Sequence, residues 1–146
     1  MAPETVSPLT MIVVYSITIF LSAGLLFLVQ PLIAKLLLPQ LGGSPSVWNT
    51  SMVFFQAVLL AGYAYAHGIS RWFSVTRACL LHTVVLLVPI ISLPIVLPKW
   101  QPPTEASPIP WLIGALAVTV GLPFFVLSST GPILQRWFGA TSHPSA

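Results

Sequence analysis

Long apolar runs without charge alternate with short polar segments along this chain. Four gaps hold no Asp, Glu, Lys or Arg, and they extend from Glu4 to Lys35, Lys35 to Arg71, Arg77 to Lys99 and Glu105 to Arg136. Each gap is long enough for the roughly 20 apolar residues that cross a hydrocarbon core of about 30 Å. The pattern therefore predicts an all-α, polytopic membrane protein with about four transmembrane helices.

The predicted spans cover about residues 9–29, 47–67, 78–97 and 111–127, and the last of them continues to about residue 137. Prolines follow or interrupt these runs at Gln30–Pro31, Pro89, Pro94 and Leu122–Pro123. Membrane helices tolerate proline where neighbours satisfy the freed carbonyls, so we expect helices that are kinked by prolines. Residues 32–41 then form either a kinked continuation of the first helix or a short interfacial helix.

The segments between the spans differ in character. Gly42 and Gly43 indicate a tight turn, and residues 69–77 read as a short basic loop. Residues 98–110 hold five prolines and should be extended.

Composition supports the membrane interpretation. The 146 residues are 56% hydrophobic and 5% charged, with a mean hydropathy of +0.96. Soluble domains carry about 25% charged residues, so this chain has too few charged side chains for a water-exposed surface. We expect one transmembrane helical module over residues 1–146.

Tryptophan and the cations indicate where the spans end. The five tryptophans all fall at predicted span ends, at Trp48, Trp72, Trp100, Trp111 and Trp137. Tryptophan prefers the membrane–water interface, where an apolar ring keeps its N–H hydrated. The net charge of +3 comes from scattered cations, so no basic patch for nucleic acid is visible.

Four spans place both termini on one side of the membrane. Arg71, Arg77 and Arg136 fall on that side, and Lys35 and Lys99 fall on the other. Cytoplasmic segments carry the excess of Lys and Arg, so this count favours cytoplasmic termini.

One face of the second span carries polar residues. Asn49, Gln56 and Tyr63 recur every seven residues, and His67 follows Tyr63 by four. One interpretation is that the stripe and Gln30 form a path for a solute or a proton. The alternative is that the stripe residues make hydrogen bonds between helices, which contribute about 0.6 kcal/mol each. In both cases we expect it to face other helices. A track of small residues, Ala57, Ala61, Ala64 and Gly68, offers a second site of close helix approach.

Catalytic patterns are missing from the sequence. There is no Gly-rich phosphate loop, no H-E-x-x-H and no C-x-x-C, and Cys79 is the single cysteine. We therefore expect no catalytic residue, no metal site and no cofactor in this chain. His67 and His82 are the candidates for ligating a haem or pigment, with hydrogen bonding as the alternative.

Two stretches resemble a known family. FLVQPLIAKLLLPQLGGSPSVWNTSMVFFQAVLLAGYAYAH, residues 27–67, and LPFFVLSSTGPILQRWF, residues 122–138, are similar to the membrane region of bacterial spermidine-synthase-like proteins, also described as fused major-facilitator/spermidine-synthase proteins. The resemblance implies a bacterial inner-membrane location. It also implies that relatives continue into further helices and a cytosolic aminopropyltransferase domain, whose catalytic positions have no counterpart here.

Measured against that family the chain looks truncated, either a fragment or a short paralogue. Our leading hypothesis is a non-catalytic multi-pass module that packs in the lipid bilayer against other transmembrane helices. Those helices belong either to its own missing region or to partner subunits of a larger complex. The alternative is a transporter-like half that moves polyamines or another small solute.

Overall fold

The computed structural model describes residues 7–103 and 107–141, and within them it is helical, with no strand. The main helices are α1 (Pro8–Leu37), α2 (Pro45–Trp72), α3 (Val75–Leu87), α4 (Ile109–Leu116) and α5 (Leu122–Gly139). Short helical segments join some of them: η1 (Leu38–Leu41), η2 (Val88–Ser92) and the π-helical η3 (Ala117–Gly121). The all-α prediction is confirmed.

Four helical runs in the described residues are long and apolar enough to cross a membrane. They are Leu9–Leu41, Pro45–Trp72, Val75–Ser92 and Ile109–Gly139. Their number and order match the four predicted spans, but the boundaries differ in three places.

The first helix does not end at Gln30. α1 continues through Pro31 to Leu37, and η1 extends the run to Leu41. The continuation was one of the two expected alternatives. Gly42 and Gly43 then turn the chain with φ of 73° and 65°, a left-handed conformation that side chains with a Cβ adopt only at a cost.

The predicted basic loop over residues 69–77 is mostly helical. α2 runs on to Trp72 and α3 begins at Val75, so only Phe73 and Ser74 connect them. Gly68 lies inside α2, because a single glycine costs a helix only about 1 kcal/mol.

The third helix is shorter than predicted. α3 and η2 together end at Ser92 and not at about residue 97, and residues 93–103 are irregular. Pro89 and Pro94 have no N–H to donate, and Pro94 also disfavours the helical conformation of Leu93. The irregular connection therefore begins earlier than the proline-rich stretch that starts at Pro98.

The last run continues past Leu122–Pro123, as predicted. α4, η3 and α5 follow one another without a break from Ile109 to Gly139. The π-helical turn of η3 lies immediately before Pro123, where the helix must accommodate a missing N–H.

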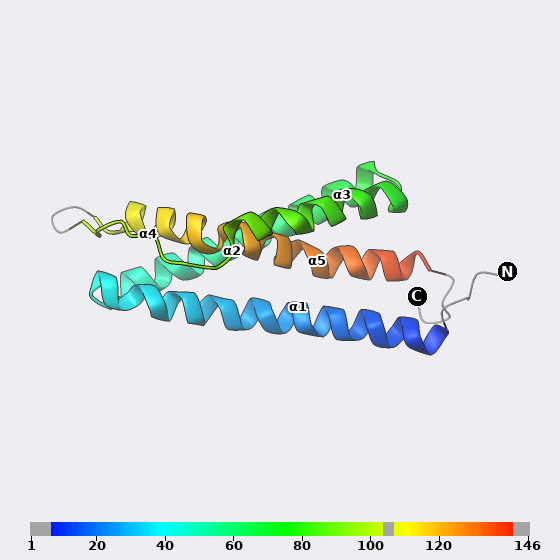
Figure 1. Ribbon diagram of the computed structural model, residues 1–146, viewed down its shortest axis with the longest axis horizontal. Helices are drawn as coiled ribbons and strands as arrows, with labels where there is room; N and C mark the ends of the chain where they lie inside the picture. Colours follow the sequence, from blue (N-terminus) through cyan, green and yellow to red (C-terminus); the bar gives the residue numbers. More distant parts are fainter. Residues whose placement is uncertain (1–6, 104–106, 142–146) are drawn as a thin grey trace.

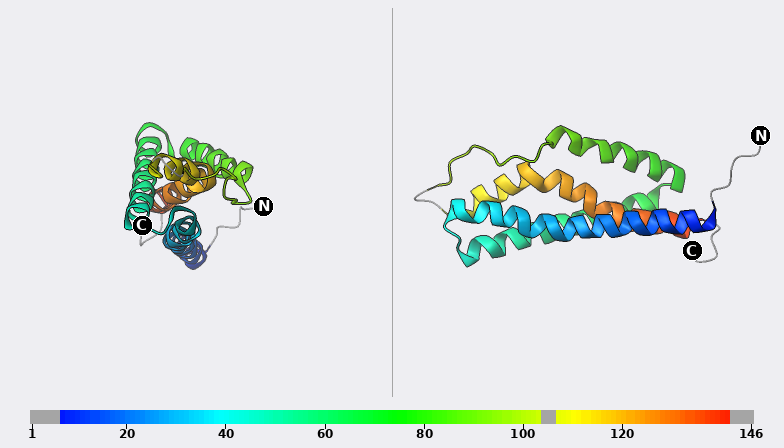
Figure 2. Two further views of the ribbon diagram at one scale, coloured as in Figure 1. Left: turned by 90° about the vertical axis from the view of Figure 1, so that its left-hand side faces the viewer. Right: turned by 60° about the horizontal axis from the view of Figure 1, so that its bottom comes forward.

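α5 is the central helix of the bundle, and it packs against α1, α2 and α3. Figure 1 shows α1 lying along one side of α5, and the end-on view in Figure 2 places α1 apart from a group formed by the other helices. The start of α1 and the end of α5 lie at one end of the bundle, together with the short α2–α3 connection. Arg71 and Arg136 therefore lie at that end, and Lys35 lies near the other.

Two clusters form the core. The larger cluster joins α1, α2 and the α4–α5 run around Phe55 and Phe124, whose ring centroids are 4.9 Å apart. The smaller cluster lies nearer the α2–α3 connection and contains Ala66, Ile69, Ala78 and Ile133.

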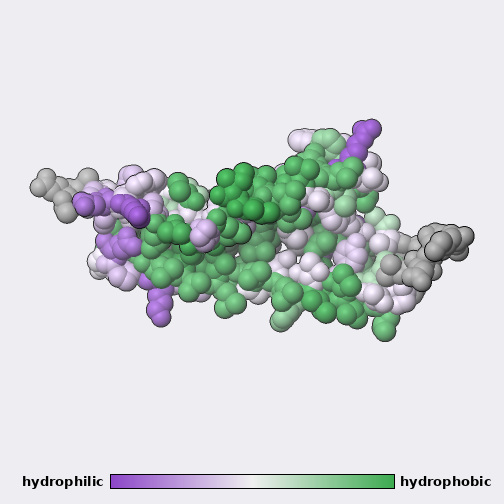
Figure 3. Space-filling model, viewed as in Figure 1, coloured by the Kyte–Doolittle hydropathy of each residue, from purple (hydrophilic) through white to green (hydrophobic). Residues whose placement is uncertain are grey.

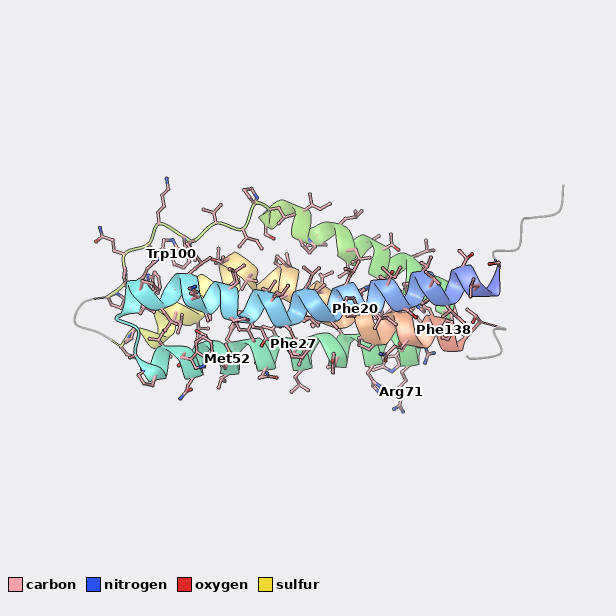
Figure 4. The ribbon with its side chains drawn as sticks, turned by 90° about the horizontal axis from the view of Figure 1, so that it is seen from below. Phe20, Phe27, Met52, Arg71, Trp100 and Phe138 are labelled. Atoms are coloured by element: carbon pink, nitrogen blue, oxygen red, sulfur yellow. The ribbon has the colours of Figure 1, made fainter. Side chains whose placement is uncertain are left out.

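The outer surface is apolar over most of its length. In the view of Figure 3, hydrophobic residues cover the middle of the bundle and hydrophilic residues gather towards its ends. Phe20 and Phe27 on α1 are 76% and 79% exposed (Figure 4). Exposed apolar surface on this scale is typical of a protein that contacts lipid or other apolar partners.

Candidate functional site

α2 has three distinct faces. Its buried residues are Val47, Ser51, Phe55, Gly62, Ala66 and Ile69. At 3.6 residues per turn, the polar stripe and the small-residue track each lie roughly 120–140° from this buried face. The helix therefore uses neither predicted face for its main contacts within the chain.

The polar stripe lies on the outside of the described bundle. Asn49, Gln56, Tyr63 and His67 are all exposed. None of their side chains makes a hydrogen bond within residues 7–103 and 107–141. The stripe makes no side-chain hydrogen bond to the described helices, and its contact with a partner stays a prediction.

The close approach of helices occurs at Gly62 rather than along the predicted small-residue track. A Cβ built on Gly62 would collide with Ser128 Oγ and would lie 3.1 Å from the carbonyl oxygen of Phe125. Only a residue without a side chain allows α2 to contact α5 so closely. The sequence does contain a signal for this contact, because Gly62 and Ala66 are two small residues spaced by four on one face of α2.

The predicted track lines an open groove instead. Ala57 and Ala61 lie opposite Ala117 and Gly121 in an apolar groove of about 460 Å³. Ala64 is exposed outside the groove, and Gly68 is half-buried.

His82 occupies a closed environment between α2, α3 and α5. Its ring is 1% exposed, and its centroid lies 6.0 Å from that of Tyr65 and 6.1 Å from that of Trp137. Nε2 lies 3.4 Å from Thr130 Oγ1, which itself donates to the Val126 carbonyl at 2.8 Å. Because that hydroxyl proton is already used, the imidazole Nε2–H is the donor to Thr130.

This packing leaves no open side on His82 for a haem or chlorophyll ring. Nδ1 of His82 and the hydroxyl of Tyr65 are both buried without a hydrogen-bond partner. His67 lies on the exposed side of α2 instead. The described residues contain no group of three His, Cys, Asp or Glu side chains that could hold a metal ion.

Among the tryptophans, Trp111 departs from the interfacial expectation. Its Nε1 is buried and has no hydrogen-bond partner, whereas Trp48, Trp72 and Trp100 are 39%, 79% and 51% exposed. Trp137 is half-buried against His82.

A crevice between α1 and α5 was not foreseen from the sequence. It consists of two adjoining hollows of about 220 and 390 Å³ that share Ile19 and Gln135. Tyr63 of the polar stripe reaches its edge, but Gln30 and Gln56 do not line it. In Figure 3, pale residues interrupt the hydrophobic surface between α1 and the helices above it.

Comparison of the chain with models of protein families, with characterised proteins and with solved structures gives no match. The function must therefore be argued from the residues and their geometry.

Proposed function

We propose that this chain is a non-catalytic, multi-pass membrane module that docks against other membrane helices. One observation carries the proposal: the amides of Asn49 and Gln56 lie on the exposed face of α2 without a hydrogen-bond partner in the described chain. In lipid an unpaired amide is costly, and a neighbouring helix that offers polar groups relieves that cost. The partner is either a further part of a longer spermidine-synthase-like protein or another subunit of a membrane complex.

Insertion in the bilayer is part of the same proposal. Four long apolar runs and their exposed aliphatic and aromatic side chains suit a hydrocarbon solvent. The end that holds Arg71, Arg77 and Arg136 faces the cytoplasm by the positive-inside rule, with both termini on that side. A bacterial inner membrane follows from the family resemblance.

The second candidate is a transporter-like half for polyamines or another small solute. The crevice between α1 and α5 favours it, because Tyr63 of the predicted solute path lies at its edge. Gln56 lies outside the crevice. Flux through proteoliposomes that Gln56→Leu abolishes without unfolding would support a path along the stripe and contradict the docking role.

Cross-linking tests the docking surface directly. A photoreactive p-benzoylphenylalanine at Leu60, which is 70% exposed beside the stripe, should form a discrete protein adduct in native membranes. Combining Asn49→Leu with Gln56→Leu removes two hydrogen bonds of about 0.6 kcal/mol each, so association should weaken roughly eightfold. The measurement is the adduct yield on a gel.

Two controls sharpen the result. Gln40→Leu makes the same substitution outside the stripe and should leave the Leu60 adduct intact. The photoreactive residue at Leu28, 66% exposed on α1, should give lipid adducts alone. Lipid adducts alone at Leu60, or a protein adduct indifferent to the double substitution, would refute docking through this face.

A further inference from the structure

The crevice between α1 and α5 has a composition that the docking role does not explain. Its α1 wall consists of residues spaced three and four apart, among them Ile12, Ile19, Ser22 and Leu26. Its α5 wall runs from Ser128 to Phe138. Together the two hollows fall in the range of about 300–1,000 Å³ that is usual for small-molecule sites.

Small residues keep this space open. Ser22 and Ala23 face Ser128 and Gly131 across the crevice. A Cβ built on Gly131 would meet no atom within 4 Å, so no side chain fills the space beside the middle of the α5 wall. The hollow is thus a consequence of side-chain size along two helices.

The crevice also holds unused hydrogen-bonding groups. Among the described residues, the side chains of Ser22, Tyr63 and Gln135 make no hydrogen bond. Pro132 has no backbone N–H, so the carbonyl of Ser128 lacks the donor it would receive from position 132 in a regular helix. Hydroxyl and amide donors therefore line the crevice, and Ser128, whose carbonyl lacks its regular helical donor, lies in the α5 wall.

The lining residues carry no formal charge, and isoleucine and leucine side chains extend along the α1 wall. A charged ligand would leave its charge unpaired here, and a hydrocarbon would leave the polar groups unsatisfied. We propose that the crevice binds an uncharged amphiphile whose head carries a hydroxyl group and ester or carbonyl oxygens. The hydroxyl donates to the Ser128 carbonyl, and Ser22, Tyr63 and Gln135 donate to the ester oxygens.

This site is separate from docking through α2, and only Tyr63 belongs to both. Gln135 and Ser22 are therefore the residues to change. Gln135 is exposed, so Gln135→Leu removes the amide without opening a cavity in the core. Gln40→Leu in η1, an exposed glutamine outside the crevice, is the matched control.

The experiment titrates 1,2-dioctanoylglycerol into the purified full chain in detergent and follows thermal unfolding by tryptophan fluorescence. The midpoint of unfolding should rise and saturate, as expected for a ligand that binds the folded state. Loss of one hydrogen bond should weaken the apparent affinity about three- to tenfold in Gln135→Leu and in Ser22→Ala. Gln40→Leu should bind the ligand as the unmodified chain does.

Three further probes define the chemistry. Trioctanoylglycerol lacks the hydroxyl group, hexadecane lacks every polar atom, and dioctanoyl phosphatidic acid carries a charge; each should bind more weakly than dioctanoylglycerol. An equal shift with hexadecane, a stronger shift with the phosphatidic acid, or full binding by Gln135→Leu would overturn the proposal. Should Ser22→Ala fail to fold, Gln135→Leu decides the question by itself.

Discussion

Phe124→Ala should be the most damaging single truncation in the bundle. Phe124 is 1% exposed, and its ring packs on Phe55, which is fully buried. Truncations of buried Phe cost about 3–5 kcal/mol in water-soluble cores through lost transfer energy and an unfilled cavity. In lipid the transfer part falls away, so a loss of roughly 2 kcal/mol or more from the cavity is expected. Reversible unfolding in mixed micelles measures this loss as a change in the free energy of unfolding.

Phe27→Ala is the matched control for this truncation. Phe27 is 79% exposed on α1, so lipid or detergent fills the space that the lost ring leaves. Its stability should change by less than about 0.5 kcal/mol, as for surface substitutions in general. Equal losses in Phe124→Ala and Phe27→Ala would show that the described core does not hold the helices together.

Gly62→Ala should separate α2 from α5. The new Cβ collides with Ser128 Oγ, and the Phe125 carbonyl oxygen 3.1 Å away belongs to the backbone of α5. The helices must move apart, and overpacking of this kind costs about 1–3 kcal/mol. The same unfolding measurement reports the loss.

Gly24→Ala provides the comparison, because a Cβ on Gly24 meets nothing within 4 Å. Alanine is the better helix former there by about 1 kcal/mol, so stability should stay equal or rise. Adding Ser128→Ala to Gly62→Ala removes the colliding hydroxyl and should recover part of the loss. Equal effects of the two glycine substitutions would contradict the close α2–α5 contact.

The number of long apolar helices was predictable from the positions of the charges. A helix that crosses a membrane cannot easily hold Lys, Arg, Asp or Glu, so the gaps between charges indicated four runs. Their exact ends were harder to predict, because proline has different outcomes in different contexts. α1 continues through Pro31, whereas the run of α3 and η2 stops before Pro94.

The packing face of α2 was not predictable from polarity. The sequence shows a polar stripe, and the cost of polar groups in lipid suggested only that it faces other helices. The buried face instead combines Phe55 with Gly62 and Ala66, which fit closely against α5. A single sequence does not distinguish a face that packs within the chain from one that packs against a partner.

The α1–α5 crevice was missed for a related reason. Ser22 on α1 is far in sequence from Gly131 and Gln135 on α5, so no periodic pattern joins the two walls. Only the antiparallel placement of α1 and α5 brings them to one hollow. The proline at 132, which frees a carbonyl there, was the one local signal.

Single-cysteine labelling in intact cells tests four membrane crossings most directly. In a Cys79→Ser background, a membrane-impermeant maleimide should label Ser44→Cys and Gln101→Cys from outside. Ser74→Cys and Thr141→Cys should react only after the membrane is opened, and all four proteins should stay in the membrane after an alkaline wash. Labelling of Ser74→Cys together with Ser44→Cys in intact cells, or release by the wash, would contradict the account.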